Sequence, residues 1–87
     1  MQLVIRPSAN KDVKSLPKAI KVEIEKLILQ IIEAKNINEL SNIKKLKGHP
    51  RAYRIKIKDY RIGFFVEDDT IILSRILHRK EVYRYFP

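Results

Sequence analysis

The sequence predicts an α+β domain in which two N-terminal helices pack on one face of a small antiparallel sheet, in the order βααβββ. Apolar residues recur at helical spacing in the first half of the chain, whereas strand-like alternation fills most of the second half. Short turns at Lys58-Asp59 and Asp68-Asp69 divide that second half into hairpins. Helices followed by strands are typical of an α+β fold. The 87 residues are expected to form a single domain over positions 1–87.

The chain is expected to open with a strand and a short helix. Residues Gln2 to Arg6 form an apolar-rich run that Pro7 ends, because proline has no N–H to donate to a strand ladder. Ser8 is a candidate N-cap for a helix from Ala9 to about Ser15.

A second, longer helix is the clearest element. Pro17 suits its first turn, where a missing N–H costs nothing, and the apolar pattern ends near residues 34–36. Its apolar stripe is better explained by core packing than by a groove for a partner, and consists of Ile20, Ile24, Leu27, Ile28, Ile31 and Ile32.

Three strands in a meander are expected to follow an irregular segment. One helical turn is predicted at Ile37 to Leu40, and a basic loop at Lys44 to Pro50. Alternation and β-branched residues then predict strands over Tyr53 to Lys58, Tyr60 to Glu67 and Thr70 to His78. The tail, residues 79–87, is expected to form a final helical turn.

The charge of the chain indicates a polyanionic partner. The formal net charge is +9, of which +2 falls in residues 1–43 and +7 in residues 44–87. A field concentrated in one half favours nucleic acid or an acidic protein segment as partner, and a solubilising surface is the alternative.

Several classes of site are excluded or not indicated. The chain has no cysteine, which excludes disulfides and thiolate metal sites, and His49 and His78 lack the carboxylate pattern of a metal site. His49 is expected to be a surface side chain. No cofactor is indicated. Neither a signal peptide nor an apolar run of about 20 residues is present, so we expect a soluble cytoplasmic protein with no membrane contact.

Alternation in the first hairpin gathers cations on one side of the sheet. With a two-residue turn at Lys58-Asp59, Lys56 pairs with Arg61 and Arg54 with Gly63, and the apolar sides of both strands meet the helices. We call the opposite side, which carries Arg54, Lys56 and Arg61, the cationic face. Like charges directly opposite each other cost up to about 1 kcal/mol. Anion binding therefore explains the cationic face better than a solvated polar surface does.

The last strand leaves two alternatives open. It ends in His78-Arg79, and a one-residue slip exchanges the faces of a strand, so the length of the Asp68-Asp69 turn is expected to decide which residue joins the cationic face. Tyr83 either stacks on a base or donates a proton there, or it packs the C-terminal turn.

Four segments in this order resemble the signature of the RelE/ParE toxin superfamily over essentially the whole chain. They are Leu46-Lys47-Gly48, Tyr53-Arg54-Ile55-Lys56, Asp59-Tyr60-Arg61-Ile62 and His78-Arg79-Lys80-Glu81-Val82-Tyr83. Resemblance to the RelE branch implies the toxin of a toxin–antitoxin pair, which cleaves messenger RNA in the ribosomal A site. It implies a cognate antitoxin, the ribosome and mRNA as partners, and metal-independent attack of a ribose 2′-OH on its own phosphate.

The resemblance also assigns roles by position. Lys56 is implied as the base, Arg61 and Arg79 as stabilisers of phosphate charge, and Tyr83 or His78 as the acid. RNA contacts are expected from the remaining basic residues of the hairpin and loop, namely Arg54, Lys58, Lys44, Lys45 and Lys47. Arg54 stands where the family has a lysine; an arginine stays protonated, so it holds phosphate but does not act as a base.

Two other functions compete with RNA cleavage. The ParE branch shares the fold and inhibits DNA gyrase, and a non-catalytic basic domain would bind ribosomal RNA or an acidic protein. Members of the ParE branch generally lack the basic set matched here, which favours the RelE branch. In either toxin branch, the antitoxin is expected to place acidic side chains near Arg61 and Arg79.

Overall fold

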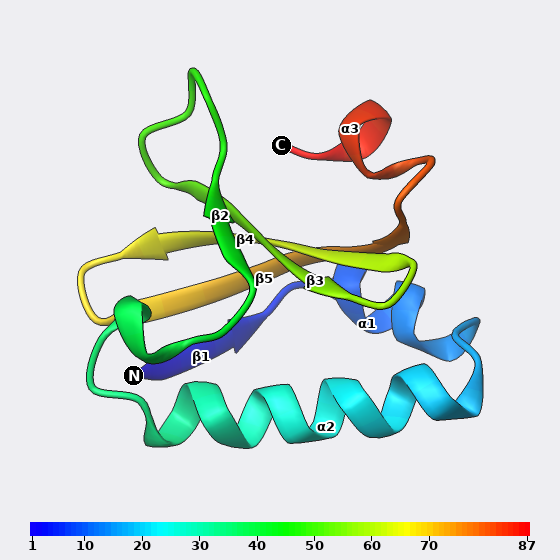
Figure 1. Ribbon diagram of the computed structural model, residues 1–87, viewed down its shortest axis with the longest axis horizontal. Helices are drawn as coiled ribbons and strands as arrows, with labels where there is room; N and C mark the ends of the chain where they lie inside the picture. The colour runs from blue at the N-terminus through cyan, green and yellow to red at the C-terminus, as the bar shows by residue number, and fades with distance from the viewer.

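The computed structural model describes all 87 residues and confirms the predicted α+β class (Figure 1). Its five strands form one sheet in the order β1-β5-β4-β3-β2. None of its helices has the length and apolar character that crossing a bilayer requires. In chain order the elements are β1 (Gln2–Ile5), α1 (Pro7–Lys14), α2 (Lys18–Glu33), the 3-10 turn η1 (Ile37–Glu39), β2 (Ile43–Lys45), β3 (Ala52–Ile57), β4 (Tyr60–Glu67), β5 (Thr70–His78) and α3 (Val82–Tyr85).

The pairs β2–β3, β3–β4 and β4–β5 are antiparallel, whereas β1 pairs parallel with β5. The bounds of β4 and β5 coincide with the predicted strands, and η1 and α3 occur where helical turns were predicted. The prediction of a basic loop from Lys44 was wrong at its start, because Lys44 and Lys45 belong to β2. Ile43 pairs with Ile55 and anchors this strand. The sequence did not predict β2, because the strand has three residues, two of them lysines, and is too short to show a strand alternation.

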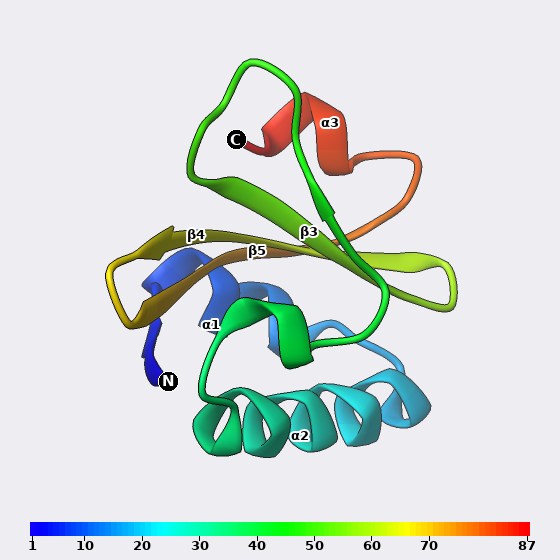
Figure 2. The same cartoon turned by 60° about the vertical axis from the view of Figure 1, so that its left-hand side comes forward.

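The main core lies between α2 and one face of the sheet. Figure 2 shows α2 running along this side. Buried residues of α2 recur every three or four positions, as predicted, and pack with apolar residues of β3, β4 and β5. Ile32 was wrongly included in this stripe: it is 55% exposed, because it lies about 100° around the helix from fully buried Ile31. The α2 members of the core are Ile20, Ile24, Leu27 and Ile31, and their sheet partners include Ile55, Ile62, Phe64 and Ile71.

Helix α1 lies against the part of β5 that β1 does not reach. The pairing of β1 ends at Ile5 opposite Leu73, and α1 follows. Ser8 Oγ donates to the carbonyl oxygen of Ser74 at 2.6 Å. The prediction that Ser8 caps α1 was wrong, because α1 begins one residue earlier, at Pro7. Arg6 is the N-cap, with extended backbone and no side-chain hydrogen bond to the helix.

Strand β5 contains a bulge beside α1. Gly63 pairs with Arg75, but the next residue of β4, Phe64, pairs with Leu73, so Ser74 is an extra residue. A bulge of this kind shifts the alternation of every later residue in its strand. The second half of β5 therefore presents different side chains to each face than an unbroken ladder would.

A second, smaller core lies on the face opposite α2. Val82 and Phe86, four residues apart in the C-terminal segment, are buried with Ala52 and are flanked by partly buried Leu46, Phe65 and Leu77. The Phe86 ring covers Gly63 so closely that a Cβ there would lie 2.5 Å from two ring atoms. Figures 1 and 2 both show α3 and the β2–β3 loop on this side of the sheet. The C-terminal segment thus covers part of the cationic face.

The Gly63–Phe86 contact predicts a specific coupling between two substitutions. Gly63→Ala should lower the free energy of unfolding by about 1–3 kcal/mol, because the added methyl group displaces the ring. In a Phe86→Ala background the same substitution should cost less than about 0.5 kcal/mol, since the clash is gone. Urea unfolding of the four proteins measures this cycle, and additive costs would contradict the contact.

Candidate functional site

The register of the first hairpin is the one predicted. Lys56 lies directly opposite Arg61 and Arg54 directly opposite Gly63. Strand β2 adds a further cation, because Lys44 pairs with Arg54. Ile55, between the two β3 cations, is buried in the core on the α2 side. Lys44, Arg54, Lys56 and Arg61 therefore share the cationic face.

The β3–β4 turn fixes the direction of the Arg61 side chain. Its Nη1 donates to the carbonyl oxygens of Lys58, at 2.9 Å, and Tyr60, at 3.0 Å. Lys58 reaches this turn with a positive φ of 52°. The other guanidinium N–H groups of Arg61 make no hydrogen bond within the chain, so they are available to a ligand.

The Ser74 bulge, rather than the length of the Asp68-Asp69 turn, decides between His78 and Arg79. The turn has two residues, with Glu67 opposite Thr70, and an unbroken ladder from there would put His78 on the cationic face. The bulge instead sets Leu77 opposite Arg61 and His78 opposite Tyr60. Our expectation that turn length would settle the matter was wrong.

His78 consequently lies apart from the cations. Its ring meets that of Tyr60 edge-on, with centroids 5.5 Å apart, and its Nδ1 accepts from the backbone N–H of Lys80 at 3.2 Å. Arg79 lies beside the β3–β4 turn. Its backbone N–H donates to the carbonyl oxygen of Asp59 at 2.7 Å, and its Nε lies 3.8 Å from Asp59 Oδ1.

Tyr83 projects from α3 into solvent. It is 61% exposed and makes no hydrogen bond within the chain. The other tyrosine of this helix, Tyr85, contacts Arg75, whose Cζ lies 5.4 Å from the ring centroid. At about 100° per residue, Tyr83 points from the opposite flank of α3. Since α3 packs on the cationic side of the sheet, Tyr83 shares that side with Arg54 and Lys56.

Arg54 has an unsatisfied donor. Its Nε is buried and has no hydrogen-bond partner. Buried polar groups nearly always find partners, and a guanidinium binds carboxylate or phosphate oxygens best. Because Nε is covered, an anion on the cationic face would reach this side chain through its Nη groups, which make no hydrogen bond within the chain.

The other expected RNA contacts are divided. Lys44 joins the cationic face and Lys58 lies in the adjoining turn, but Lys45 pairs with Tyr53 and so belongs to the opposite face. Lys47 lies in the β2–β3 loop, which together with Lys45 at the end of β2 lines an open hollow of about 510 Å³. No three His, Cys, Asp or Glu side chains are grouped so that they could hold a metal ion.

Sequence reasoning missed the ion pair that Arg75, opposite Gly63, makes with α1. Arg75 donates to Asp12 through Nε, at 2.8 Å, and through Nη2, at 3.1 Å. These hydrogen bonds to the carboxylate raise the pKa of Arg75, while burial opposes the rise. The sequence did contain a signal for two other features, the bulge and the close packing of the C-terminal segment. Glycine inside a strand marks a bulge or a close approach, and Gly63 has both: it borders the bulge and lies under Phe86.

Comparison with known proteins gives consistent matches. Residues 3–83 match the family described as the ParE toxin of type II toxin-antitoxin system, parDE. The chain is 41% identical to Toxin RelE3 of Methanocaldococcus jannaschii over 88 residues, covering all of both proteins. It is 35% identical to Putative toxin RelE1 of the same organism, covering 82% of this chain and 80% of that one.

Solved structures match the fold. The RelB-RelE antitoxin-toxin complex from Methanococcus jannaschii contains a chain with a TM-score of 0.85 and 39% identity, covering 97% of this chain and 99% of that one. The archaeal RelE-RelB complex from Pyrococcus horikoshii OT3 gives a TM-score of 0.75 at 24% identity, covering 93% and 97%, and so supports the fold alone.

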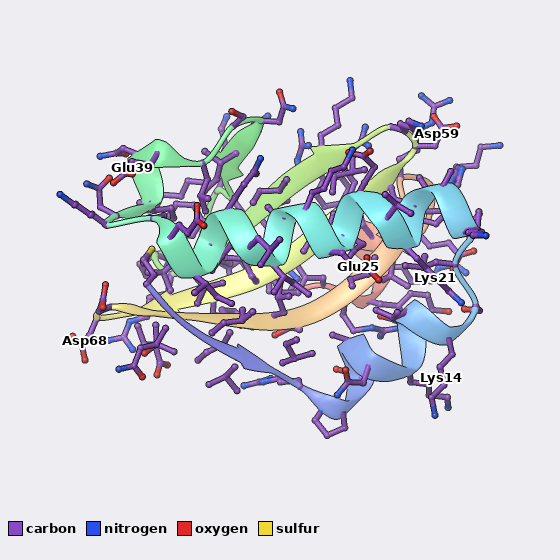
Figure 3. All side chains as sticks on the ribbon, turned by 90° about the horizontal axis from the view of Figure 1, so that it is seen from below. Lys14, Lys21, Glu25, Glu39, Asp59 and Asp68 are labelled. Atoms are coloured by element: carbon purple, nitrogen blue, oxygen red, sulfur yellow. The ribbon has the colours of Figure 1, made fainter.

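Asp59 is the one acidic residue that pairs with a cation beside the β3–β4 turn. Its negative charge should therefore weaken the binding of an anionic ligand there. Asp59→Asn should tighten binding of a single-stranded RNA about three- to fivefold in low salt, because it removes a repulsive charge about 4 Å from Arg79. Asp68→Asn is the matched control, since Figure 3 shows Asp59 and Asp68 at opposite ends of the sheet. Equal tightening by both variants, measured by fluorescence anisotropy, would mean that only net charge matters.

Proposed function

The chain belongs to the RelE/ParE superfamily of type II toxin–antitoxin toxins, and on that premise we propose that it is a ribosome-dependent endoribonuclease that cleaves messenger RNA. One observation carries the proposal: the hairpin register sets Lys56 directly opposite Arg61, and Arg79 lies at the same end of the sheet. Three basic side chains thus belong to one end of the sheet, and two of them are arginines, which do not act as bases.

The proposed reaction requires no metal. The ribose 2′-OH attacks its own phosphorus, the bond from phosphorus to the 5′-oxygen breaks, and the products are a cyclic phosphate and a free 5′-OH. A base takes the 2′-OH proton, and an acid returns a proton to the leaving 5′-oxygen. Negative charge builds on the phosphate oxygens between these two events, and preorganised cations stabilise it.

The residues of the cationic face suit these roles. Arg61 and Arg79 stabilise the phosphate charge, and Arg61 is already oriented by its bonds to the turn carbonyls. Lys56 accepts the 2′-OH proton when its amine is in the neutral form, because an ammonium group has no lone pair to accept one. Tyr83 donates to the leaving oxygen; we prefer it to His78, which stands opposite Tyr60 on the other face. Arg54 holds an adjacent phosphate through its unpaired guanidinium.

A second candidate function is inhibition of DNA gyrase. The family description that matches residues 3–83 is that of ParE toxins, which favours this alternative. The relatives with at least 35% identity are toxins of the RelE type, which favours RNA cleavage. A non-catalytic RNA-binding module would share the cationic face but release no product. A supercoiling assay with purified gyrase and an mRNA cleavage assay separate the three functions.

We also propose an antitoxin partner for this chain. The structural relative from Methanococcus jannaschii, which is 39% identical to this chain, comes from a RelB-RelE antitoxin-toxin complex. With a net charge of +9, this toxin would bind a segment whose acidic side chains mask Arg61 and Arg79. Bound there, the segment would compete directly with RNA.

The nuclease proposal predicts the effect of removing either arginine. Arg61→Ala and Arg79→Ala should each lower the cleavage rate about 10²- to 10³-fold, because each removes a cation that stabilises the transition state. The measurement is mapping of mRNA 5′ ends in a translating extract, where wild-type protein should give cuts in phase with codons. Lys18→Ala, an exposed charge at the start of α2, is the control and should cleave normally. Full cleavage by both arginine variants would refute the assignment.

Masking by the antitoxin predicts a charge-reversal effect. Arg79→Glu should weaken antitoxin binding at least tenfold in low salt and less in high salt, because the contact is electrostatic and exposed. Lys18→Glu makes the same change on the α2 side and should leave affinity unchanged. Titration calorimetry at two salt concentrations measures both. If both variants bind alike, the antitoxin does not mask this face.

A further inference from the structure

Two side chains of α1 replace a neighbouring strand along the bulged part of β5. Ser8 and Asp12 are four residues apart and lie on the same side of α1. Ser8 Oγ donates to the Ser74 carbonyl oxygen at 2.6 Å, and Asp12 Oδ2 accepts from the backbone N–H of Ile76 at 2.9 Å. These bonds flank Arg75 and satisfy backbone groups that β1 is too short to pair. Helix α1 therefore holds β5 in its bulged register.

That register determines which side chains the RNA would meet. Beyond Ser74 the alternation is shifted by one residue, so Leu77 stands opposite Arg61 and Arg79 follows on the alternate position. If the bulge relaxed into an unbroken ladder, His78 would move to the cationic face and Arg79 away from it.

The same carboxylate is connected to the C-terminal helix. Asp12 binds Arg75 with two hydrogen bonds, and both side chains are largely shielded, at 12% and 28% exposed. The Arg75 guanidinium in turn lies over the ring of Tyr85 in α3, with 5.4 Å between Cζ and the ring centroid. Contacts thus run without interruption from α1 through β5 to the helix that carries Tyr83.

We propose that Asp12 is a positioning residue for the cationic face: it holds the bulge that presents Arg79 and, through Arg75 and Tyr85, it orients the helix that presents Tyr83. Asp12 itself touches no substrate in this proposal. Its effect on cleavage rests on the proposed nuclease function, whereas its effect on the geometry of β5 and α3 does not. The alternative is an ordinary ion pair that stabilises the domain and nothing more.

Kinetics of cleavage separate these two roles. Asp12→Asn and Asp12→Ala should lower the single-turnover rate on programmed ribosomes about 10- to 100-fold, because small displacements of reacting groups cost factors of this size. Half-saturation should change less than about threefold, because the cations that bind RNA remain. Val13→Ala, which removes a partly buried contact from the same helix, controls for stability and should cleave at the wild-type rate.

Tyr85 supplies a second pair of variants that leaves Asp12 intact. Tyr85→Phe keeps the ring under Arg75 and should cleave normally, whereas Tyr85→Ala should lower the rate at unchanged half-saturation. Because Tyr85 is half exposed, neither change should prevent folding. Equal rates for Phe and Ala at this position, or equal losses for Val13→Ala and Asp12→Asn, would overturn the positioning role.

Hydrogen exchange tests the geometry without any cleavage. In Asp12→Asn, the amides of Ile76 and Phe86 should exchange at least about tenfold faster, since the first loses an ionised acceptor and the second lies in the tethered segment. Amides in the middle of α2 should not change. Uniform acceleration throughout the chain would show only global destabilisation and would refute the proposal, as would no acceleration. If the wild-type protein cleaves no mRNA, the proposed function fails, and this exchange pattern alone decides the role of Asp12.

Discussion

The extra residue at Ser74 is the constraint on which the candidate site depends. A strand has only two faces, so one inserted residue exchanges the position of every side chain that follows it. In β5 the insertion turns His78 toward Tyr60 and leaves Leu77 beside Arg61. A bulge leaves backbone groups without ladder partners, and here α1 supplies them through Ser8 and Asp12. The helix nearest the N-terminus thus contacts the strand segment that decides which side chains β5 places on the cationic face.

The two faces of the sheet divide stability from binding. Helix α2 buries one face with a continuous apolar core, which fixes the hairpin register and so forces Lys56 and Arg61 together on the other. Setting Lys56 opposite Arg61 is unfavourable by itself. The chain offsets little of this repulsion, because the acidic residue of the adjoining turn, Asp59, is exposed and pairs with Arg79 instead, at 3.8 Å. The apolar core tolerates this cost. An anion bound on the cationic face would offset this repulsion.

The sequence predicted the elements whose structure depends on residues that are close together in the chain. The Lys58-Asp59 turn and the alternation beside it gave the register of β3 and β4 correctly, and β4 and β5 begin and end as expected. The bulge could not be predicted this way, because its partners in α1 are more than sixty residues distant in sequence. The Asp12–Arg75 pair was missed for the same reason. Strand β2 was missed because three residues give no period, and Ile32 was misplaced because the sequence does not show where the core ends.

Fold similarity alone does not choose between an RNA-cleaving and a gyrase-inhibiting toxin, because function resides in the site and not in the shape that carries it. The discriminating property is the set of groups that can bind phosphate and move protons on the cationic face. Arginine stays protonated at neutral pH, so in the proposed reaction Arg54, Arg61 and Arg79 would bind phosphate and stabilise its charge. In the proposed reaction, proton transfer falls to Lys56 on strand β3 and to Tyr83 on a short helix held by Phe86 and Arg75. Because proton transfer depends on reach, the attachment of α3 to the sheet matters as much to the proposed reaction as the cations themselves.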